Sequence, residues 1–234
     1  MAYTNQNGCL FPNRTIRHMF KLDPNKPISD SQLEQLIHSG TDGFVVGGSD
    51  GVSEQKVEEL YRRIQHTSLP LCYEMTQADA FVFGFDFYFI PIVLNTTNLD
   101  WIGQRHVQAL QIYDSRLTWL PYETLPYLIL NPNCKAAELT CAKTDLTIGE
   151  VLAYTQLSTE IFHIPLLYIE YSGVYGDLTL VKQIAIRHPN VHIFYGGGIV
   201  SREQAEEMGR YVQTVVVGNV IYQDFERALQ TVGI

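Results

Sequence analysis

Eight short runs of apolar, β-branched and aromatic residues recur along the chain, and most are followed by a segment with the spacing of an amphipathic helix. Such nearly continuous hydrophobicity is typical of strands that are buried on both faces of a parallel sheet. Eight strands that alternate with helices predict an α/β fold, the (β/α)8 or TIM barrel, for which about 250 residues are usual and 234 are present. We expect one domain over residues 1–234, with an N-terminal extension at 1–16. The predicted strands are His18–Asp23, Phe44–Gly48, Leu71–Met75, Phe87–Pro91, Tyr127–Pro132, Leu166–Tyr171, Val191–Gly197 and Thr214–Asn219.

One helix of the predicted barrel is short or absent. Only eleven residues, TQADAFVFGFD, separate Met75 from Phe87, and their closely spaced phenylalanines and glycine do not fit a packed helix. The third helix is therefore expected to be replaced by an irregular segment, unless the predicted strand boundaries are displaced. The gap would leave an apolar groove on that side of the barrel, near Phe81 and Phe83. Other helices are expected at residues 32–40, 54–65, Leu99–Tyr113, Ile148–Phe162, Asp177–Arg187, Arg202–Val212 and Asp224–Val232.

Charge and composition disfavour several classes of protein. The 16 Lys and Arg residues are outnumbered by 25 Asp and Glu residues, and the net charge of −9 disfavours nucleic-acid binding. The longest apolar stretch, Phe87–Leu94, has eight residues, whereas a transmembrane helix needs about 20. The polar N-terminus lacks the apolar core of a signal peptide. Together with four cysteines that form no CxxC pair, these features predict a cytoplasmic protein with reduced thiols.

Polar residues at the predicted carboxyl ends of the strands are the candidate site residues, because the active sites of such barrels lie there. Lys21 and Asp23 are two residues apart, so they point to the same face of the first strand. A lysine and an aspartate at the barrel mouth suit a phosphate and a divalent metal, although a structural ion pair has the same spacing. Ser49 follows two glycines that either admit a ligand to the backbone or form a turn. Glu74 and Asp86 would either join the surroundings of the metal or face water.

The sixth predicted strand carries a second group of polar residues. Tyr168, Glu170 and Ser172 alternate along the chain and therefore share one face. A carboxylate that points into a barrel is costly to bury unless it is paired or has a role. Glu170 is therefore a candidate to accept a proton or a hydrogen bond from a substrate hydroxyl. The alternative is a structural glutamate whose hydrogen bonds are satisfied within the protein.

Glycines after the last two strands predict an anion site. Gly196, Gly197 and Gly198 end the seventh strand, Gly218 and Asn219 end the eighth, and a helix is expected to follow Ser201. Unpaired N–H groups and a helix N-terminus both favour an anion, and this is the usual phosphate position of TIM barrels. The residues therefore predict a bound phosphate monoester, with simple tight turns as the alternative.

Several longer motifs in fixed order resemble those of the geranylgeranylglyceryl phosphate synthase family, and most of all its bacterial PcrB-type branch of heptaprenylglyceryl phosphate synthases. They are FKLDP (20–24), GGSDG (47–51), GFDFYFIPIVLN (84–95), LNPNCKAAELT (130–140), YIEYSGVYGD (168–177), FYGGGI (194–199) and VVVGNVIY (215–222). The resemblance covers residues 17–232. It implies a barrel whose third helix is replaced by a looser segment. It also implies a Mg2+-dependent prenyltransferase that joins sn-glycerol 1-phosphate to a polyprenyl diphosphate through an ether bond and releases diphosphate.

The resemblance also implies roles for single residues. Lys21 and Glu170 would be catalytic, and Asp23 and Ser49 would hold the magnesium. Ala109 stands where archaeal relatives carry a bulky aromatic residue, and would leave a prenyl groove beside Phe81 and Phe83 open for a long, heptaprenyl (C35) donor. Members of the family are often homodimers. The contacts to glycerol 1-phosphate would come from Lys21, Tyr168, Ile169, Glu170, Tyr171, Ser172, Gly173, Gly198, Gly218 and Asn219.

Two other functions fit a phosphate-binding barrel. A phosphosugar isomerase or aldolase needs a Schiff-base lysine or a paired acid and base deep in the barrel. The one lysine among residues 166–219, Lys182, falls on a predicted helix, which disfavours an aldolase. A non-catalytic barrel that binds phosphate or lipid would not need Lys21, Asp23 and Glu170 together. For an enzyme with a lipid product we expect peripheral contact with a membrane, although a net charge of −9 provides no basic anchor.

Overall fold

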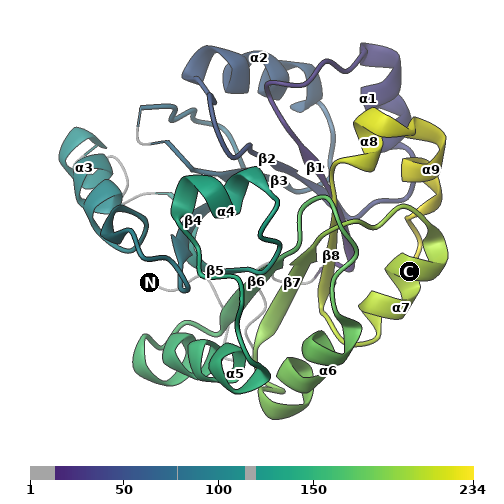
Figure 1. Ribbon diagram of the computed structural model, residues 1–234. Helices are drawn as coiled ribbons and strands as arrows, with labels where there is room; N and C mark the ends of the chain where they lie inside the picture. Colours follow the sequence, from purple (N-terminus) through teal and green to yellow (C-terminus); the bar gives the residue numbers. More distant parts are fainter. Residues whose placement is uncertain (1–13, 78, 114–119) are drawn as a thin grey trace.

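The computed structural model describes residues 14–77, 79–113 and 120–234. Its eight strands form a closed parallel barrel in chain order, with β8 hydrogen-bonded back to β1 (Figure 1). This confirms the predicted TIM barrel. The strands are β1 His18–Leu22, β2 Gly43–Val46, β3 Leu71–Glu74, β4 Phe87–Val93, β5 Tyr122–Ile129, β6 Leu166–Glu170, β7 His192–Gly196 and β8 Thr214–Val217.

Strand β5 begins earlier than predicted, at Tyr122 instead of Tyr127. Its first five residues include Glu123 and Pro126, which interrupt the apolar run. Proline cannot donate to a ladder and usually marks an edge or an irregular part of a sheet. Pairing with β4 nevertheless continues through these residues, with Phe89 opposite Glu123 and Ile92 opposite Pro126. The long neighbouring strand therefore extends β5 where the local sequence alone does not.

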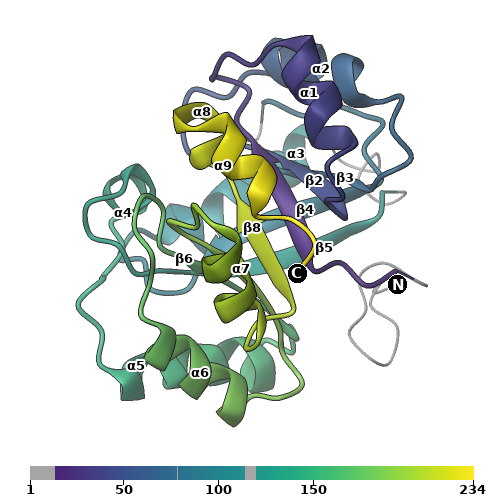
Figure 2. The ribbon, with the colours of Figure 1, turned by 90° about the vertical axis from the view of Figure 1, so that its right-hand side faces the viewer.

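Helices surround the barrel, and all the predicted ones are present (Figure 1). The predicted helix Leu99–Tyr113 is divided into a 3-10 turn and α3, and the predicted helix Ile148–Phe162 ends as a π-helical turn. The short helices α4 and α8 were not predicted, and α8 follows directly on β8 (Figure 2). The bounds are α1 Asp30–Ile37, α2 Glu54–Ile64, η1 Leu99–Trp101, α3 Gln104–Tyr113, α4 Lys135–Thr140, α5 Ile148–Gln156, η3 Leu157–Ile161, α6 Leu178–Arg187, α7 Arg202–Gly209, α8 Val220–Gln223 and α9 Phe225–Gln230.

An irregular segment replaces the third helix, as predicted: the described residues between β3 and β4 form no helix. Their aromatic side chains pack directly on the outside of the barrel. The Phe81 ring stacks on Tyr88 with centroids 5.4 Å apart, and the Phe85 ring stacks on Tyr73 at 5.0 Å. The hydroxyl of Tyr88 donates to the carbonyl of Val82 at 3.0 Å. These rings fill the space that a helix would occupy, so the aromatic composition serves packing here.

The core has two layers, and the layers decide which side chains can reach the barrel mouth. Inward-facing residues such as Phe89, Tyr168 and Phe194 fill the barrel, while outward-facing ones such as Ile169 and Leu167 pack under the helices. Alternation along β6 therefore directs Tyr168 inward and Ile169 outward. Among the helices of the described residues, none is long and apolar enough to span a bilayer.

Candidate active site

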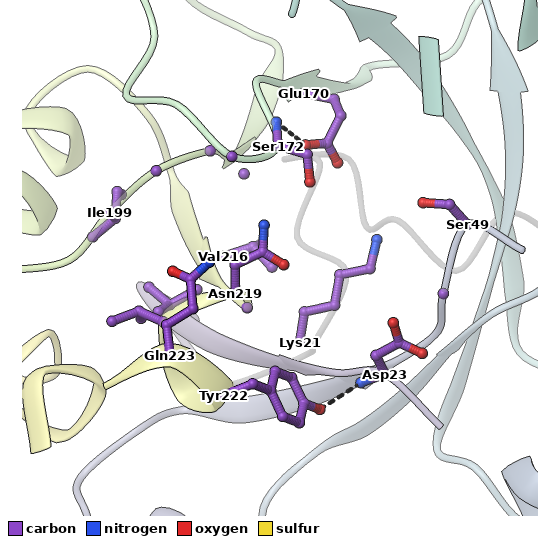
Figure 3. A pocket seen from close by; sticks show the side chains of 18 of the residues that line it. Lys21, Asp23, Ser49, Glu170, Ser172, Ile199, Val216, Asn219, Tyr222 and Gln223 are labelled. Atoms are coloured by element: carbon purple, nitrogen blue, oxygen red, sulfur yellow. Dashed lines mark hydrogen bonds between the residues drawn. The ribbon is translucent and has the colours of Figure 1, made fainter. Parts of the chain in front are cut away.

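A pocket opens at the carboxyl ends of β1, β2, β6, β7 and β8. This is the end at which TIM barrels carry their active sites. Figure 3 shows the side chains of Lys21, Ser49 and Glu170 pointing into one shared space. The structure brings together in this pocket the predicted site residues Lys21, Asp23, Ser49, Tyr168, Glu170, Ser172, Gly173, Gly198, Gly218 and Asn219.

Two predicted contact residues, Ile169 and Tyr171, do not line the pocket with their side chains. Ile169 is fully buried in the outer layer of the core, because it lies between two inward-facing residues of β6. The Tyr171 ring packs towards Tyr195, with centroids 6.3 Å apart, and its backbone amide donates to the carbonyl of Gly196 at 2.7 Å. These two residues shape the site only through the backbone.

Lys21 is held by a buried carboxylate that the sequence left unassigned. Its ammonium donates to both oxygens of Glu74, at 3.0 and 2.7 Å. Burial disfavours the charged ammonium, but the attraction of Glu74 and Glu170 outweighs this effect and raises the pKa of Lys21. Lys21 is therefore a permanent cation at the barrel mouth. Glu74 is only 4% exposed, so it does not face water. It also does not line the pocket that contains Asp23, so it is not part of the surroundings expected for a metal.

Glu170 is a buried carboxylate with the properties of a general base. It is 7% exposed, and its Oε1 accepts a 2.7 Å hydrogen bond from the backbone amide of Ser172. Burial raises the pKa of Glu170 to about 7; attraction to Lys21 acts in the opposite direction, and the negative charge of Glu74 adds to the rise. A carboxylate with this pKa exchanges protons readily near neutral pH. The geometry therefore suits proton transfer at Glu170.

The ends of β7 and β8 form a corner that can accept an anion. The backbone amides of Gly198, Gly218 and Asn219 donate no hydrogen bond to any other described residue, so they are available to a ligand. Lys26 adds a positive charge, since its ammonium donates to Oδ1 of Asn219 at 3.0 Å. The helix next to this corner is α8, which starts directly after Asn219. The helix predicted after Ser201 is also present: Ser201 caps α7, and its side chain accepts a hydrogen bond from the amide of Gln204 at 3.4 Å.

Two different physical reasons explain why glycine occurs at the positions of this corner. At Gly197 a Cβ would lie 2.4 Å from the Cβ of Tyr171, and at Gly198 it would lie 2.1 Å from the backbone nitrogen of Tyr175. Gly198 also has a φ of +54°, which strains other residues. A Cβ at Gly218 would meet only the carbonyl and Cβ of Lys21, at 3.5 and 3.6 Å. The protein would therefore tolerate a side chain at Gly218, and the space beside it remains open to a ligand.

Asp23 and Ser49 face the same pocket from β1 and the loop after β2. Oδ1 of Asp23 accepts a 2.9 Å hydrogen bond from the amide of Asn25, and the hydroxyl of Tyr222 accepts one from the amide of Asp23 at 2.8 Å. No group of three His, Cys, Asp or Glu residues that could bind a metal occurs in the described ranges. One carboxylate and one hydroxyl fit Mg2+ nevertheless, since this ion is usually held by one or two carboxylates together with substrate phosphates. Asp23 and Ser49 can therefore hold magnesium only with a ligand that supplies further oxygens.

A second cavity lies between α3 and strands β4 and β5. We call it the apolar groove. Ala109 lines it, whereas Phe81 and Phe83 border a separate hollow next to α2. The three predicted groove residues are thus not brought together, because Phe81 packs on Tyr88 of the barrel and Phe83 is exposed beside α2. The groove is lined by Met75, Thr76, Gln77, Tyr88, Ile90, Pro91, Trp101, Arg105, His106, Ala109, Leu110, Leu120, Tyr122 and Thr124.

A small third cavity, which we call the junction, has lining residues in common with both the polar pocket and the apolar groove. It shares Lys21, Ser49 and Glu170 with the polar pocket, and Thr76, Pro91 and Trp101 with the apolar groove. The other residues that line the junction are Glu74, Val93, Tyr127, Ile129, Ala136, Leu139 and Thr140. A molecule with an anionic head and a long apolar tail could therefore place its head near Lys21 and its tail against α3.

Comparison with known proteins identifies the family. Residues 13–233 match the PcrB family. The chain belongs to the PcrB family. It is 48% identical over 219 residues to the heptaprenylglyceryl phosphate synthase of Geobacillus kaustophilus (strain HTA426), covering 94% of this chain and 92% of the relative. It is 45% identical over 216 residues to the enzyme of the same name from Bacillus cereus (strain ATCC 14579), covering 92% and 94%.

Solved structures agree with this PcrB-family barrel. The (S)-3-O-geranylgeranylglyceryl phosphate synthase of Thermoplasma acidophilum, in complex with its substrate sn-glycerol-1-phosphate, superposes with a TM-score of 0.76 at 20% identity over 92% of each chain. The synthase of Thermoplasma volcanium gives the same TM-score and identity over 94% of each chain. At this identity the likeness shows the fold.

Sequence reasoning missed several residues of the site. No sequence pattern singles out Tyr127 or Lys26 as site residues, and Tyr222 stands only at the end of a longer motif. Lys26 lies over the ring of Tyr222, with its ammonium 4.9 Å from the ring centroid. The one available signal was position, since all three lie within a few residues of a strand end. Lys182 lies on α6 with its ammonium 5.7 Å from the ring centroid of Tyr211, outside the pocket.

Proposed function

We propose that this protein transfers a long polyprenyl group from its diphosphate to the 3-hydroxyl of sn-glycerol 1-phosphate, forming an ether bond and releasing diphosphate. The observation that carries the proposal is the junction, which is lined by Lys21, Ser49 and Glu170 of the polar pocket and by Thr76, Pro91 and Trp101 of the apolar groove. The names of the relatives at 44–48% identity support the same reaction.

The glycerol phosphate would be anchored at its phosphate end. The unpaired amides of Gly198, Gly218 and Asn219 would donate to the phosphate oxygens, and Lys26 lies beside them. Fixing one end of a three-carbon molecule limits where the other end can reach. The free hydroxyls would then point across the pocket towards Glu170 and Ser172, which lie on the facing wall. Such positioning is a large part of the rate enhancement of a two-substrate reaction.

Glu170 would receive the proton of the reacting hydroxyl. The oxygen of that hydroxyl forms a bond to C1 of the prenyl chain while the bond between C1 and the diphosphate oxygen breaks. The hydroxyl proton passes to Oε of Glu170, and the electron pair leaves with the diphosphate. The amide of Ser172 keeps the carboxylate oriented during this step.

The negative charge on the departing diphosphate has to be neutralised. Lys21 provides one fixed positive charge at the junction. Asp23 and Ser49 would hold Mg2+, which would supply a second positive charge for the diphosphate. The resemblance and the oxygen ligands both support this metal.

The prenyl tail would occupy the apolar groove, where each buried CH2 contributes about 0.8 kcal/mol. Ala109 projects from α3 into this groove, and its small side chain leaves the far part open. We therefore infer a long donor, of the heptaprenyl (C35) class.

We further infer that the protein is a cytoplasmic homodimer that binds peripherally to a membrane. The resemblance supports the dimer. The exposed apolar residues Leu99, Val107 and Leu110 beside the groove support the membrane contact, because the donor and the product are both lipids. Analytical ultracentrifugation tests the dimer, and co-sedimentation with phospholipid vesicles tests the membrane contact.

A transfer assay with radiolabelled sn-glycerol 1-phosphate tests the function. The protein is incubated with C20 or C35 prenyl diphosphate in the presence of Mg2+, and the label is extracted into organic solvent. We expect product with both donors and a clear preference for C35. Absence of labelled lipid with either donor would refute the prenyltransferase, and cleavage of a phosphosugar by the same preparation would favour the aldolase class instead.

A further inference from the structure

Glu74 ends β3 and is, with Glu170, one of the two buried carboxylates among the described residues. Its side chain is 5% exposed and accepts three hydrogen bonds, two from the ammonium of Lys21 at 3.0 and 2.7 Å and one from the hydroxyl of Tyr127. These contacts connect β3 to β1 and β5 across the inside of the barrel. The sequence offers Glu74 a place near the metal or in water, and its contacts with Lys21 and Tyr127 fit neither.

The position of Glu74 separates it from the phosphate and metal subsites. Glu74 lines the junction but not the polar pocket, whereas Lys21 lines both. The hydrogen bonds of Glu74 therefore reach the polar pocket through Lys21. The backbone makes room for this arrangement, because a Cβ at Gly47 would lie 2.9 Å from the Cβ of Glu74.

The ammonium of Lys21 also lies beside two stacked aromatic rings. The ammonium lies 5.5 Å from the ring centroid of Tyr168, and that ring stacks on Tyr127 with centroids 4.4 Å apart and planes at 15°. Glu74 holds the ammonium from one side while Tyr127 fixes Glu74 from the other. An ion pair buried in this way is a weak source of stability, since well-packed apolar residues of the same volume often do as well. The arrangement is better explained by the need to place one cation.

We propose that Glu74 is a positioning residue for the transfer reaction: it fixes the Lys21 ammonium at the junction, where the anionic head of the prenyl donor meets the polar pocket. This inference rests on the proposed function for the identity of the anion. Without the carboxylate, the flexible four-carbon stem of Lys21 would let the ammonium move towards Glu170 or into the open pocket. The cation would then be present but misplaced.

A double-mutant cycle tests the proposal, using Glu74→Gln, Lys21→Met and the double variant. The amide of Gln keeps the shape of the side chain and removes its charge. We expect Glu74→Gln to lower kcat/KM by about tenfold or more in the native background, as misplaced catalytic groups do. In the Lys21→Met background the same change should alter kcat/KM by less than about threefold. Equal effects of Glu74→Gln in both backgrounds would overturn the proposal.

Thr214→Val is the matched control for loss of buried hydrogen bonds. Thr214 is fully buried at the opposite end of β8, where its hydroxyl donates to the carbonyl of Ile16 at 2.8 Å and contacts His192 at 2.9 Å. We expect this variant to lower the melting temperature and to leave turnover unchanged at a temperature well below melting. A loss of turnover in Thr214→Val as large as in Glu74→Gln would show that general destabilisation explains both, and would overturn the positioning role.

The same cycle is measured a second time by calorimetric binding of inorganic pyrophosphate, which needs no prenyl transfer. We expect weaker binding in Glu74→Gln and no further loss from that change once Lys21 is Met. If the native protein transfers no prenyl group, the proposed function fails, and the binding cycle still decides whether Glu74 acts on an anion through Lys21. Additive effects on pyrophosphate binding contradict the proposal whether or not transfer occurs.

Discussion

The backbone amide of Ser172 lies 2.7 Å from Oε1 of Glu170 and donates a hydrogen bond to it. The turn after β6 therefore folds back on the carboxylate that ends the strand. In turn, Nδ2 of Asn131 donates to the carbonyl of Ser172 at 2.6 Å, which ties this turn to the end of β5. The carboxylate of Glu170 is thus buried, oriented and still open to the pocket on its other side.

Replacing Glu170 with Gln removes the proton acceptor and keeps the size of the side chain. We expect kcat to fall by about 100-fold or more, with the KM for glycerol 1-phosphate changing by less than a few fold. Steady-state kinetics with the C35 donor measures both. A loss confined to KM would mean that Glu170 binds the substrate and does not take its proton.

The raised pKa of Glu170, about 7 against 4.5, also predicts a dependence of stability on pH. The folded state holds this proton more tightly than the unfolded chain. The associated stability is therefore complete below about pH 4.5 and is lost as the pH rises towards 7. Glu170→Gln removes this dependence. The free energy of unfolding of the variant should therefore rise relative to that of the native protein between pH 5 and pH 8, by up to roughly 3 kcal/mol. Urea titrations at the two pH values measure it, and an unchanged difference between the two proteins would show that burial does not shift this group.

Asp23→Ala tests the proposed metal ligand. The Asp23 side chain accepts one hydrogen bond, from the amide of Asn25, and is partly exposed, so the fold should survive. We expect Mg2+-supported turnover to fall by about 100-fold or more and the melting temperature to change little. Turnover at the native rate with Mg2+ would refute the role in metal binding.

Two glycine substitutions separate a packing role from a ligand role. Gly218→Ala should keep the native stability and raise the KM for glycerol 1-phosphate, because the new methyl group meets only Lys21 and otherwise enters the pocket. Gly198→Ala should destabilise the fold by about 2 kcal/mol or more, because of its positive φ and the backbone 2.1 Å from the new Cβ. Thermal melts and substrate titrations distinguish the two; a stable Gly198→Ala with native kinetics contradicts this reading of the corner.

Ala109→Trp tests the position of the prenyl tail. The indole would fill the part of the apolar groove that Ala109 leaves open, so the variant should use a C20 donor in preference to C35. The ratio of kcat/KM for the two donors is the measure. Phe83→Ala is the control, since Phe83 is exposed and lies outside the groove, and should keep the native ratio. An unchanged ratio in Ala109→Trp would place the tail elsewhere.

Strand periodicity predicted much of the site and none of its pairings. The alternation of Tyr168, Glu170 and Ser172 fixes one face of β6, so their common direction could be read from the sequence. Lys21 and Glu74 are 53 residues apart, and only closure of the barrel brings them into contact. Spacing along the chain holds no information about such a pair.

The apolar groove was harder to predict for a different reason. Phe81, in the irregular segment between β3 and β4, and Ala109, on α3, are both apolar residues. Phe81 nevertheless stacks on Tyr88, while Ala109 faces the cavity. A sequence does not distinguish an aromatic residue that replaces a helix from one that lines a groove. Likewise, the helix at the anion corner is the four-residue α8, which is too short to show a helical period.

A crystal structure of the protein with sn-glycerol 1-phosphate and an unreactive C35 thiodiphosphate tests the central claim most directly. The account predicts the glycerol phosphate on the amides of Gly198, Gly218 and Asn219, the thiodiphosphate beside Lys21, and the tail along Ala109. The reacting oxygen and C1 should then lie about 3–3.5 Å apart next to Glu170. A phosphate bound away from these amides, or a tail outside the groove, would contradict the account.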